Sequence, residues 1–268
     1  MGTERLLTER IRGLIRPASS SGRHQGAGRT PELGREVYQN SIMAALIDGV
    51  YDGDVAVEQL LERGDFGVGT FNHLNGEMLV LDGTCFHLSA NGRVETARKE
   101  DLSPFSVMVR FAPDEALEVP TPMDRPELTQ LIDDRTRGPN LIYSVRVDGN
   151  FSEVRTRTVR EQSAPYPPLI QASADQAETV FTGLQGTLAG FRTPEYLQGI
   201  SVAGYHLHFI DELHTRGGHC LDFRILSGTV SICEHTALRI RLPAVGKFLD
   251  ADLSSPDLGE QIRDVEGR

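Results

Sequence analysis

The most informative residues of this sequence are histidines that fall close together in a β-rich stretch. His206 and His208 stand two residues apart in segment 204–209 (GYHLHF), whose residues favour a strand. Alternate side chains of a strand share one face, so both imidazoles project together. The Gly217-Gly218 pair is typical of a tight turn that brings a neighbouring strand, and with it His219, alongside. Three converging neutral imidazoles are the arrangement that holds catalytic zinc with one position open. Four of the eight histidines lie within fourteen residues: His206, His208, His214 and His219.

An open zinc position polarises oxygen atoms or activates water, and two further side chains are candidates to act beside it. Arg157 is expected on a strand. If its face closes a pocket, the guanidinium binds a carboxylate through two parallel hydrogen bonds; otherwise it lies on a solvated rim. Glu77 follows the Asn75-Gly76 turn and shares a strand face with Leu79 and Leu81. It lies either at an exposed strand end or partly buried, and burial would raise its pKa and suit it to proton transfer.

The elements that must position these residues are mostly short strands with few helices. We predict hairpins across Asn75-Gly76, Asp148-Gly149 and Ser227-Gly228, because such dipeptides mark two-residue turns. Helices are expected over 55–63, 127–137 and from about 254 to the end. The Pro-rich segment 161–168 is the expected boundary between an N-terminal β-rich domain (36–165) and a C-terminal domain (166–268).

Composition restricts the classes of function. The 268 residues carry a net charge of −11. Residues 1–35 contain seven Arg and three Glu, so we interpret them as a tail with a net positive charge. The acidic body would repel a phosphate backbone, which argues against nucleic acid as a partner. No apolar run reaches the length of a membrane span, so no membrane partner is expected. Three widely spaced cysteines, at 85, 220 and 233, indicate reduced thiols in the cytoplasm.

Six segments, read in order from about residue 37 onward, form a set that is specific only when taken together. They are 50–54 (VYDGD), 64–72 (GDFGVGTFN), 75–77 (NGE), 155–159 (RTRTV), 190–194 (GFRTP) and 204–209 (GYHLHF). This set resembles the acetolactate decarboxylase family. The likeness covers nearly the whole body of the chain and leaves out residues 1–35.

The resemblance implies an α/β (mixed α+β) fold of two domains, each built on a mixed or largely antiparallel sheet with few helices. It places zinc in the C-terminal domain and implies a homodimer. The implied reaction is loss of CO2 from (S)-2-acetolactate to give (R)-acetoin, with Zn2+ and no organic cofactor. The implied site residues are His206, His208 and His219 as zinc ligands, Glu77 and Glu266 as active-site carboxylates, Arg157 as carboxylate holder, and Thr70 on the pocket wall.

Three other interpretations remain open from the residues alone. His206-x-His208-x-x-x-Glu212, followed by Gly218, resembles the first metal motif of a cupin, which would make Glu212 a ligand and predict iron or manganese in an oxygenase or isomerase. The second cupin motif is not found downstream. A non-enzymatic metal-binding or ligand-sensing module explains the histidines but gives Arg157 and Glu77 no role. Segment 205–209 also resembles the aromatic-flanked His-x-His of carbonic anhydrases, but only locally.

Overall fold

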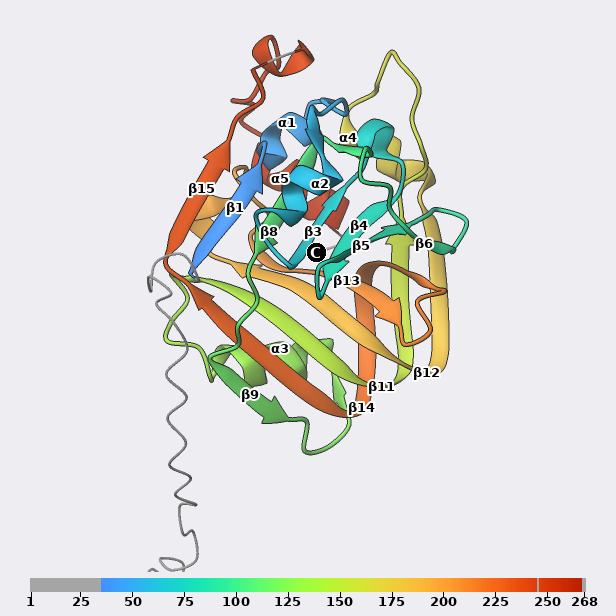
Figure 1. Ribbon diagram of the computed structural model, residues 1–268, viewed down its shortest axis with the longest axis vertical. Coiled ribbons are helices and arrows are strands. Elements are labelled where there is room, and N and C mark those ends of the chain that lie inside the picture. The colour runs from blue at the N-terminus through green and yellow to red at the C-terminus, as the bar shows by residue number, and fades with distance from the viewer. Residues whose placement is uncertain (1–34, 245, 267–268) are drawn as a thin grey trace, which may run out of the picture.

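Two β-sheets pack against each other in the computed structural model, which describes residues 35–244 and 246–266 (Figure 1). Both sheets are largely antiparallel, and the helices between and beside them are short. The predicted mixed α+β fold is therefore confirmed. Apart from Arg35, the N-terminal extension expected over residues 1–35 lies outside the described residues.

The first sheet is mixed, because its edge strand β15 runs parallel to β1 while every other neighbouring pair is antiparallel. Both faces of its central strands are covered by apolar residues, as in β4 (EMLVL), whose five residues are all buried. In spatial order its strands are β15 (Ala237–Arg241), β1 (Glu36–Asn40), β8 (Phe105–Val109), β3 (Phe66–Thr70), β4 (Glu77–Leu81), β5 (Thr84–Leu88) and β6 (Val94–Thr96).

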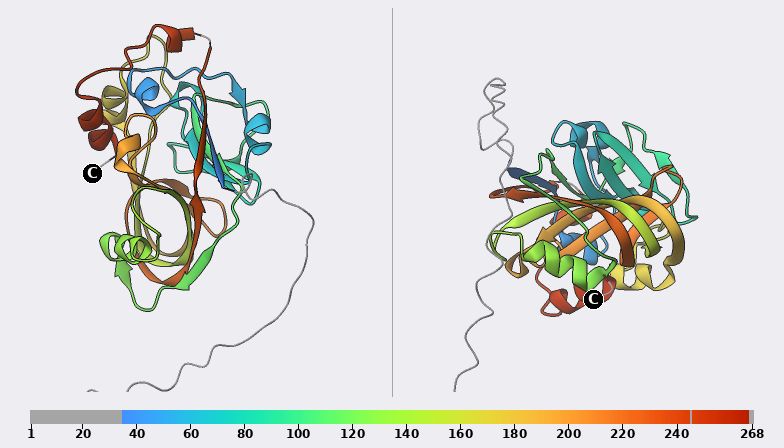
Figure 2. Two further views of the ribbon diagram at one scale, coloured as in Figure 1. Left: turned by 90° about the vertical axis from the view of Figure 1, so that its left-hand side faces the viewer. Right: turned by 90° about the horizontal axis from the view of Figure 1, so that it is seen from below.

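The second sheet closes on itself. Three of its strands are very long, and β13 pairs both with β12 and with β14, so that β14, β11, β12 and β13 form a ring, seen end-on in the left panel of Figure 2. Closure removes the free edges that an open sheet would leave. Its strands are β9 (Glu115–Glu118), β10 (Met123–Asp124), β11 (Ile142–Thr158), β12 (Ala177–Thr193), β13 (Gly204–Asp211) and β14 (Gly217–His235).

Two of the predicted hairpins do not exist. Asp148-Gly149 lies inside β11 and Ser227-Gly228 inside β14, each as part of one continuous strand. In the sheet, Gly149 lies opposite both Gly186 and Gly228, so three neighbouring strands carry glycine at the same level. A Cβ atom at Gly149 would lie 2.5 Å from the Ser227 carbonyl oxygen, so the glycines permit close approach of backbones where the ring curves. The hairpin across Asn75-Gly76, between β3 and β4, is present.

The remaining elements are short. The helices predicted over 55–63, 127–137 and from 254 are present with different bounds. Among the described residues, no helix has the length and apolar character needed to cross a lipid bilayer. The helices are α1 (Met43–Ile47), α2 (Val57–Leu61), α3 (Arg125–Asp133), α4 (Leu169–Ala172) and α5 (Leu258–Glu266); the 3-10 turns are η1 (Asn72–Leu74), η2 (Ser173–Asp175), η3 (Glu195–Leu197) and η4 (Gly246–Leu249); β2 (Val55–Ala56) pairs with β7 (Leu102–Ser103).

Apolar residues fill three main spaces. One cluster lies inside the ring of the second sheet, and another lies on the far face of the first sheet, beneath α2. The largest joins the two sheets, since it combines Leu79 and Leu81 of β4 with Phe191 of β12 and with Ile262 and Val265 of α5. Helices α1, α4 and α5 contact one another at one end of this joint. The joint between the sheets is therefore where residues distant in sequence meet.

The expected domain boundary near residue 165 stays a prediction, and the sheets do not divide the chain there. Strands β9, β10 and β11 precede residue 165 but belong to the second sheet. Strand β15, near the C-terminus, belongs to the first sheet through its parallel pairing with β1. The two sheets thus exchange segments, and neither can be cut away at residue 165 without losing strands.

Acid is expected to destabilise the fold through His235, the last residue of β14. His235 is 1% exposed, and among the described residues only its Nε2 has a hydrogen-bond partner, the Ser144 hydroxyl at 2.8 Å. Burial lowers the pKa of His235 to about 4. The unfolded chain, with an ordinary histidine pKa of about 6.5, binds more protons between these values, so stability falls as pH drops through this window.

Urea unfolding of the wild type and of His235→Gln between pH 7.5 and pH 4.5 measures this effect. The wild type should lose roughly 2–3 kcal/mol more of its unfolding free energy than the variant over that range, as expected for a folded-state pKa more than two units below the unfolded one. Other acid-sensitive groups are common to both proteins and cancel in the difference. Equal losses in the two proteins would show that His235 does not titrate in this way.

Candidate metal centre and active site

Three imidazoles converge at the joint between the sheets. His206 and His208 lie on one face of β13, and His219 of β14 is the antiparallel register partner of His208. The ring centroids are 5.0 to 5.5 Å apart, and one nitrogen from each ring lies within 4.8 Å of the other two. Strand periodicity thus places the histidines as the sequence predicts, with nitrogen donors close enough to share one ion.

The buried histidines have the protonation states that metal ligands need. Nδ1 of His208 lies 2.9 Å from the carbonyl oxygen of Met78, which can only accept, so Nδ1 carries the proton and Nε2 keeps its lone pair. That Nε2 atom is buried and has no hydrogen-bond partner among the described residues. Burial holds the pKa of His208 and of His219 well below the ordinary value, and the Arg157 charge contributes at His219. Two buried neutral imidazoles, one with an unpartnered lone pair, fit a divalent cation.

The turn between β13 and β14, the strands that carry the three histidines, is not where the sequence predicts it. Gly217 and Gly218 lie within β14, and the chain reverses at residues 212–216. Asp211 organises the reversal, because its carboxylate accepts hydrogen bonds from the backbone and side chain of both Thr215 and Arg216 at 2.7 to 3.0 Å. A Cβ atom at Gly218 would lie 3.0 Å from the carbonyl oxygen of Arg157. The glycine pair therefore allows close packing of β14 rather than a turn.

Two carboxylates lie beside the imidazoles, one against His208 and the other against His219. Glu77, at the start of β4, is 9% exposed, and its Oε2 lies 3.8 Å from Nε2 of His208. Burial, opposed by the Arg157 charge and assisted by that of Glu266, raises the pKa of Glu77 to about 7. Glu266, at the end of α5, is 5% exposed, and its Oε2 lies 3.6 Å from Nε2 of His219. Of the two situations considered for Glu77, the structure has the buried one.

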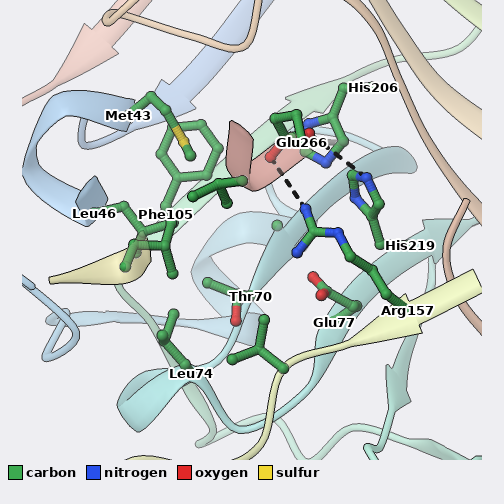
Figure 3. A pocket seen from close by; sticks show the side chains of 14 residues that line it. Met43, Leu46, Thr70, Leu74, Glu77, Phe105, Arg157, His206, His219 and Glu266 are labelled. Carbon is green, nitrogen blue, oxygen red and sulfur yellow. Dashed lines mark hydrogen bonds and ion pairs between the residues drawn. The ribbon is translucent and has the colours of Figure 1, made fainter. Parts of the chain in front are cut away.

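Arg157 is buried in the same place and does not lie on a solvated rim. It is 3% exposed, on β11, and its Nη2 donates to Oε1 of Glu266 at 3.4 Å. Nη1 donates to the amide oxygen of Gln176 at 3.2 Å, whereas Nε has no acceptor among the described residues. Figure 3 shows the guanidinium between Glu266 and Glu77. A buried cation with an unused donor can bind an anionic group.

Glu77, Arg157, Glu266 and two of the histidines, His206 and His219, line one cavity together with an apolar wall (Figure 3). Thr70 of β3 lines it as predicted, but its hydroxyl donates to the carbonyl oxygen of Gly76 at 2.7 Å and so holds the turn before Glu77. A cavity with a cationic end, carboxylates and apolar walls suits a small anionic molecule with alkyl groups. The apolar wall is formed by Met43, Leu46, Leu74, Phe105, Val159, Leu169 and Val265.

The structure therefore gathers all the residues predicted for the site, contributed by both sheets and by α5. Sequence reasoning missed two groups that contact them, the carbonyl of Met78 and the side chain of Gln176. A backbone carbonyl has no sequence signal, and the reach of Gln176 depends on how β12 begins. Glu212, which the cupin interpretation requires as a ligand, is exposed in the turn at 212–216.

Comparison with known proteins agrees with this geometry. The sequence profile of the alpha-acetolactate decarboxylase family matches residues 37–255. The chain is 40% identical to the alpha-acetolactate decarboxylase of Bacillus subtilis strain 168 over 232 residues, covering 87% of this chain and 91% of that protein. It is 42% identical to that of Klebsiella aerogenes over 230 residues, covering 86% and 88%. The cupin interpretation is not favoured by these matches.

Solved structures agree as well. The crystal structure of the Bacillus subtilis strain 168 protein matches with a TM-score of 0.86, covering 87% of this chain and 100% of that one, at 40% identity. A Staphylococcus aureus protein of unknown function, described as similar to alpha-acetolactate decarboxylase, matches with a TM-score of 0.83 at 26% identity, covering 86% and 99%. Residue 266 lies beyond the profile match, so the placement of Glu266 rests on the structure. From its profile match, its relatives and its fold, the chain belongs to the alpha-acetolactate decarboxylase family, a family of carboxy-lyases.

Proposed function

We propose that this protein decarboxylates (S)-2-acetolactate to (R)-acetoin and depends on zinc held by His206, His208 and His219. The family supports the decarboxylase activity itself. The observation that supports the metal dependence is the meeting of three imidazoles next to a cavity that is lined by a buried guanidinium and two buried carboxylates. Decarboxylation of a β-keto acid moves the electron pair of the broken bond onto the ketone oxygen, and a cation held by these imidazoles would stabilise the negative charge that develops there.

Three imidazole nitrogen donors suit zinc, which takes this number of protein ligands in catalytic sites. When bound, the cation supplies a Lewis acid that polarises the ketone and hydroxyl oxygens of the substrate. Magnesium and calcium prefer oxygen ligands, whereas the three histidines offer nitrogen. The carbonyl of Met78 fixes His208 in the tautomer that a metal ligand needs. Since Met78 belongs to the first sheet and His208 to the second, packing of the sheets orients the ligand.

Arg157 is proposed to hold the carboxylate that leaves as CO2. Its guanidinium is buried and lines the cavity, and no described residue accepts a hydrogen bond from its Nε–H. A buried charge-assisted hydrogen bond orients an anion more strongly than an exposed one, because little water competes. The negative body of the protein also makes a local cation necessary, since an anionic substrate must enter against a net charge of −11.

Glu77 is proposed to deliver the proton that completes the reaction. Loss of CO2 breaks the carbon–carbon bond and leaves an enediolate, and one proton added to carbon gives acetoin. Glu77 lies 3.8 Å from His208, and Glu266 lies 3.6 Å from His219. Protonation from one fixed side sets the configuration of the product. The apolar wall accommodates the two methyl groups and excludes water as a competing proton source.

The homodimer and the cytoplasmic location expected from the sequence are part of this proposal and stay predictions. The three cysteines are free and buried, which suits a reducing compartment.

Incubation of the purified zinc-loaded protein with racemic 2-acetolactate tests the proposed function. Chiral gas chromatography of the product should show acetoin of R configuration, formed in step with CO2 release. Racemic acetoin would refute the proposed stereochemical control by the two carboxylates, and absence of acetoin would refute the activity. A reaction without protein corrects for spontaneous decarboxylation of the β-keto acid.

A further inference from the structure

Gln176 contacts Arg157, the cationic side chain that lines the cavity. It is not one of the site residues that the family resemblance implies. It follows η2 and directly precedes β12, with its backbone N–H donating to the carbonyl of Ser173 at 3.2 Å. The next residue, Ala177, begins the pairing of β12 with β11. Gln176 is therefore held at the point where β12 starts, and its partly buried side chain extends to Arg157.

The hydrogen bonds of Arg157 leave one edge of its guanidinium available. Nη1 donates to the amide oxygen of Gln176 at 3.2 Å, and Nη2 donates to Glu266 at a long 3.4 Å. Nε is buried and has no acceptor among the described residues. Nε–H and the neighbouring Nη2–H point the same way from the planar group, and this pair of donors matches the two oxygens of a carboxylate.

We propose that Gln176 is a positioning residue for the substrate carboxylate, acting through Arg157. Its amide oxygen accepts a hydrogen bond from Nη1 and so fixes the rotation of the guanidinium. The edge formed by Nε and Nη2 is then left for the substrate. Because an amide is neutral, Gln176 does this without compensating the positive charge. A glutamate at this position would make the same hydrogen bond, but it would add a second carboxylate beside Glu266 and weaken the attraction for an anionic substrate.

This inference rests on the proposed function, since it assumes that the carboxylate of acetolactate binds Arg157. Two ligands separate orientation of the carboxylate from general effects on the site. The first, 2,3-dihydroxy-2-methylbutanoate, is the substrate with its ketone reduced, so it cannot lose CO2. The second, butane-2,3-diol, keeps the two hydroxyls and lacks the carboxylate. Inhibition constants for both are measured on zinc-loaded wild type, Gln176→Glu and Gln176→Leu.

The carboxylate ligand should bind both variants at least about tenfold more weakly than the wild type, whereas the diol should change by less than about twofold. For acetolactate itself, KM should rise while kcat at saturation stays within about threefold. Gln176→Leu removes the acceptor without adding charge, so it also serves if the charged variant fails to fold. The matched control is Gln171→Glu, the same substitution at an exposed position of α4, which should change neither constant.

If the Gln176→Glu variant bound 2,3-dihydroxy-2-methylbutanoate as tightly as the wild type does, the proposed role of the neutral amide would be overturned. An equal loss of affinity for both ligands, in either variant, would show that Gln176 supports the structure in general and does not position the carboxylate. Failure of the proposed function is seen separately, since wild-type protein would then form no acetoin. Wild-type activity together with unchanged variants rejects this inference alone.

Discussion

Glu77→Gln is expected to lower kcat by roughly 100- to 10,000-fold while the protein keeps its metal, because general acid–base catalysis contributes about that factor. Glutamine preserves the size of the side chain but has no carboxylic acid proton to deliver. It also removes an ionisable group whose burial already raises its pKa, so the fold should not lose stability. Steady-state formation of acetoin, with zinc content measured by mass spectrometry, gives both quantities.

The control for this substitution is Glu195→Gln, which makes the same change at an exposed position of η3 and should leave kcat unaltered. Turnover of Glu77→Gln within about threefold of the wild type would remove Glu77 as the proton donor. Loss of zinc together with turnover would instead show that Glu77, at 3.8 Å from His208, supports metal binding.

His219→Ala is expected to abolish activity by removing one of three metal ligands. His219 is 3% exposed and lies directly opposite His208 in the ladder, so no other described histidine can take its place. Zinc affinity should fall at least about 100-fold, a larger loss than supporting residues around a metal produce. Competition with a fluorescent zinc chelator measures the affinity directly and independently of activity.

His214→Ala is the matched control, because His214 lies in the same stretch of sequence but is exposed in the turn between the ligand strands and packs beside Phe86. This variant should bind zinc as the wild type does. Unchanged zinc affinity in His219→Ala would refute its role as a ligand, whatever happened to activity.

Strand periodicity was sufficient to predict that the three histidines converge, but not the connections between their strands. The spacing of His206 and His208 fixes a common face on any strand, so that prediction survived. The prediction of a turn at Gly217-Gly218 was wrong because dipeptide signals describe local backbone preference only. Here β14 already begins at these glycines, because Ile210 and Phe209 of β13 pair with them. Tertiary pairing likewise carries β11 through Asp148-Gly149.

The parts of the site that could not be predicted depend on distant segments meeting. Glu266 reaches Arg157 across 109 positions of sequence, and only the family resemblance pointed to it. The burial of Glu77 and Arg157, which the residue pattern left open, follows from α5 and the two sheets closing around them. The contact of Gln176 with Arg157 requires the exact start of β12, and element bounds are what sequence patterns fix least well.

The central claim, that one divalent ion held by three imidazoles is required for turnover, is tested most directly by removing and restoring the metal. Protein treated with a strong chelator and then dialysed should form acetoin from acetolactate at least about 100-fold more slowly. Titration with Zn2+ should restore full activity at one ion per chain, and His206→Ala should not recover under the same titration. Full activity in protein shown by mass spectrometry to be metal-free would contradict the claim.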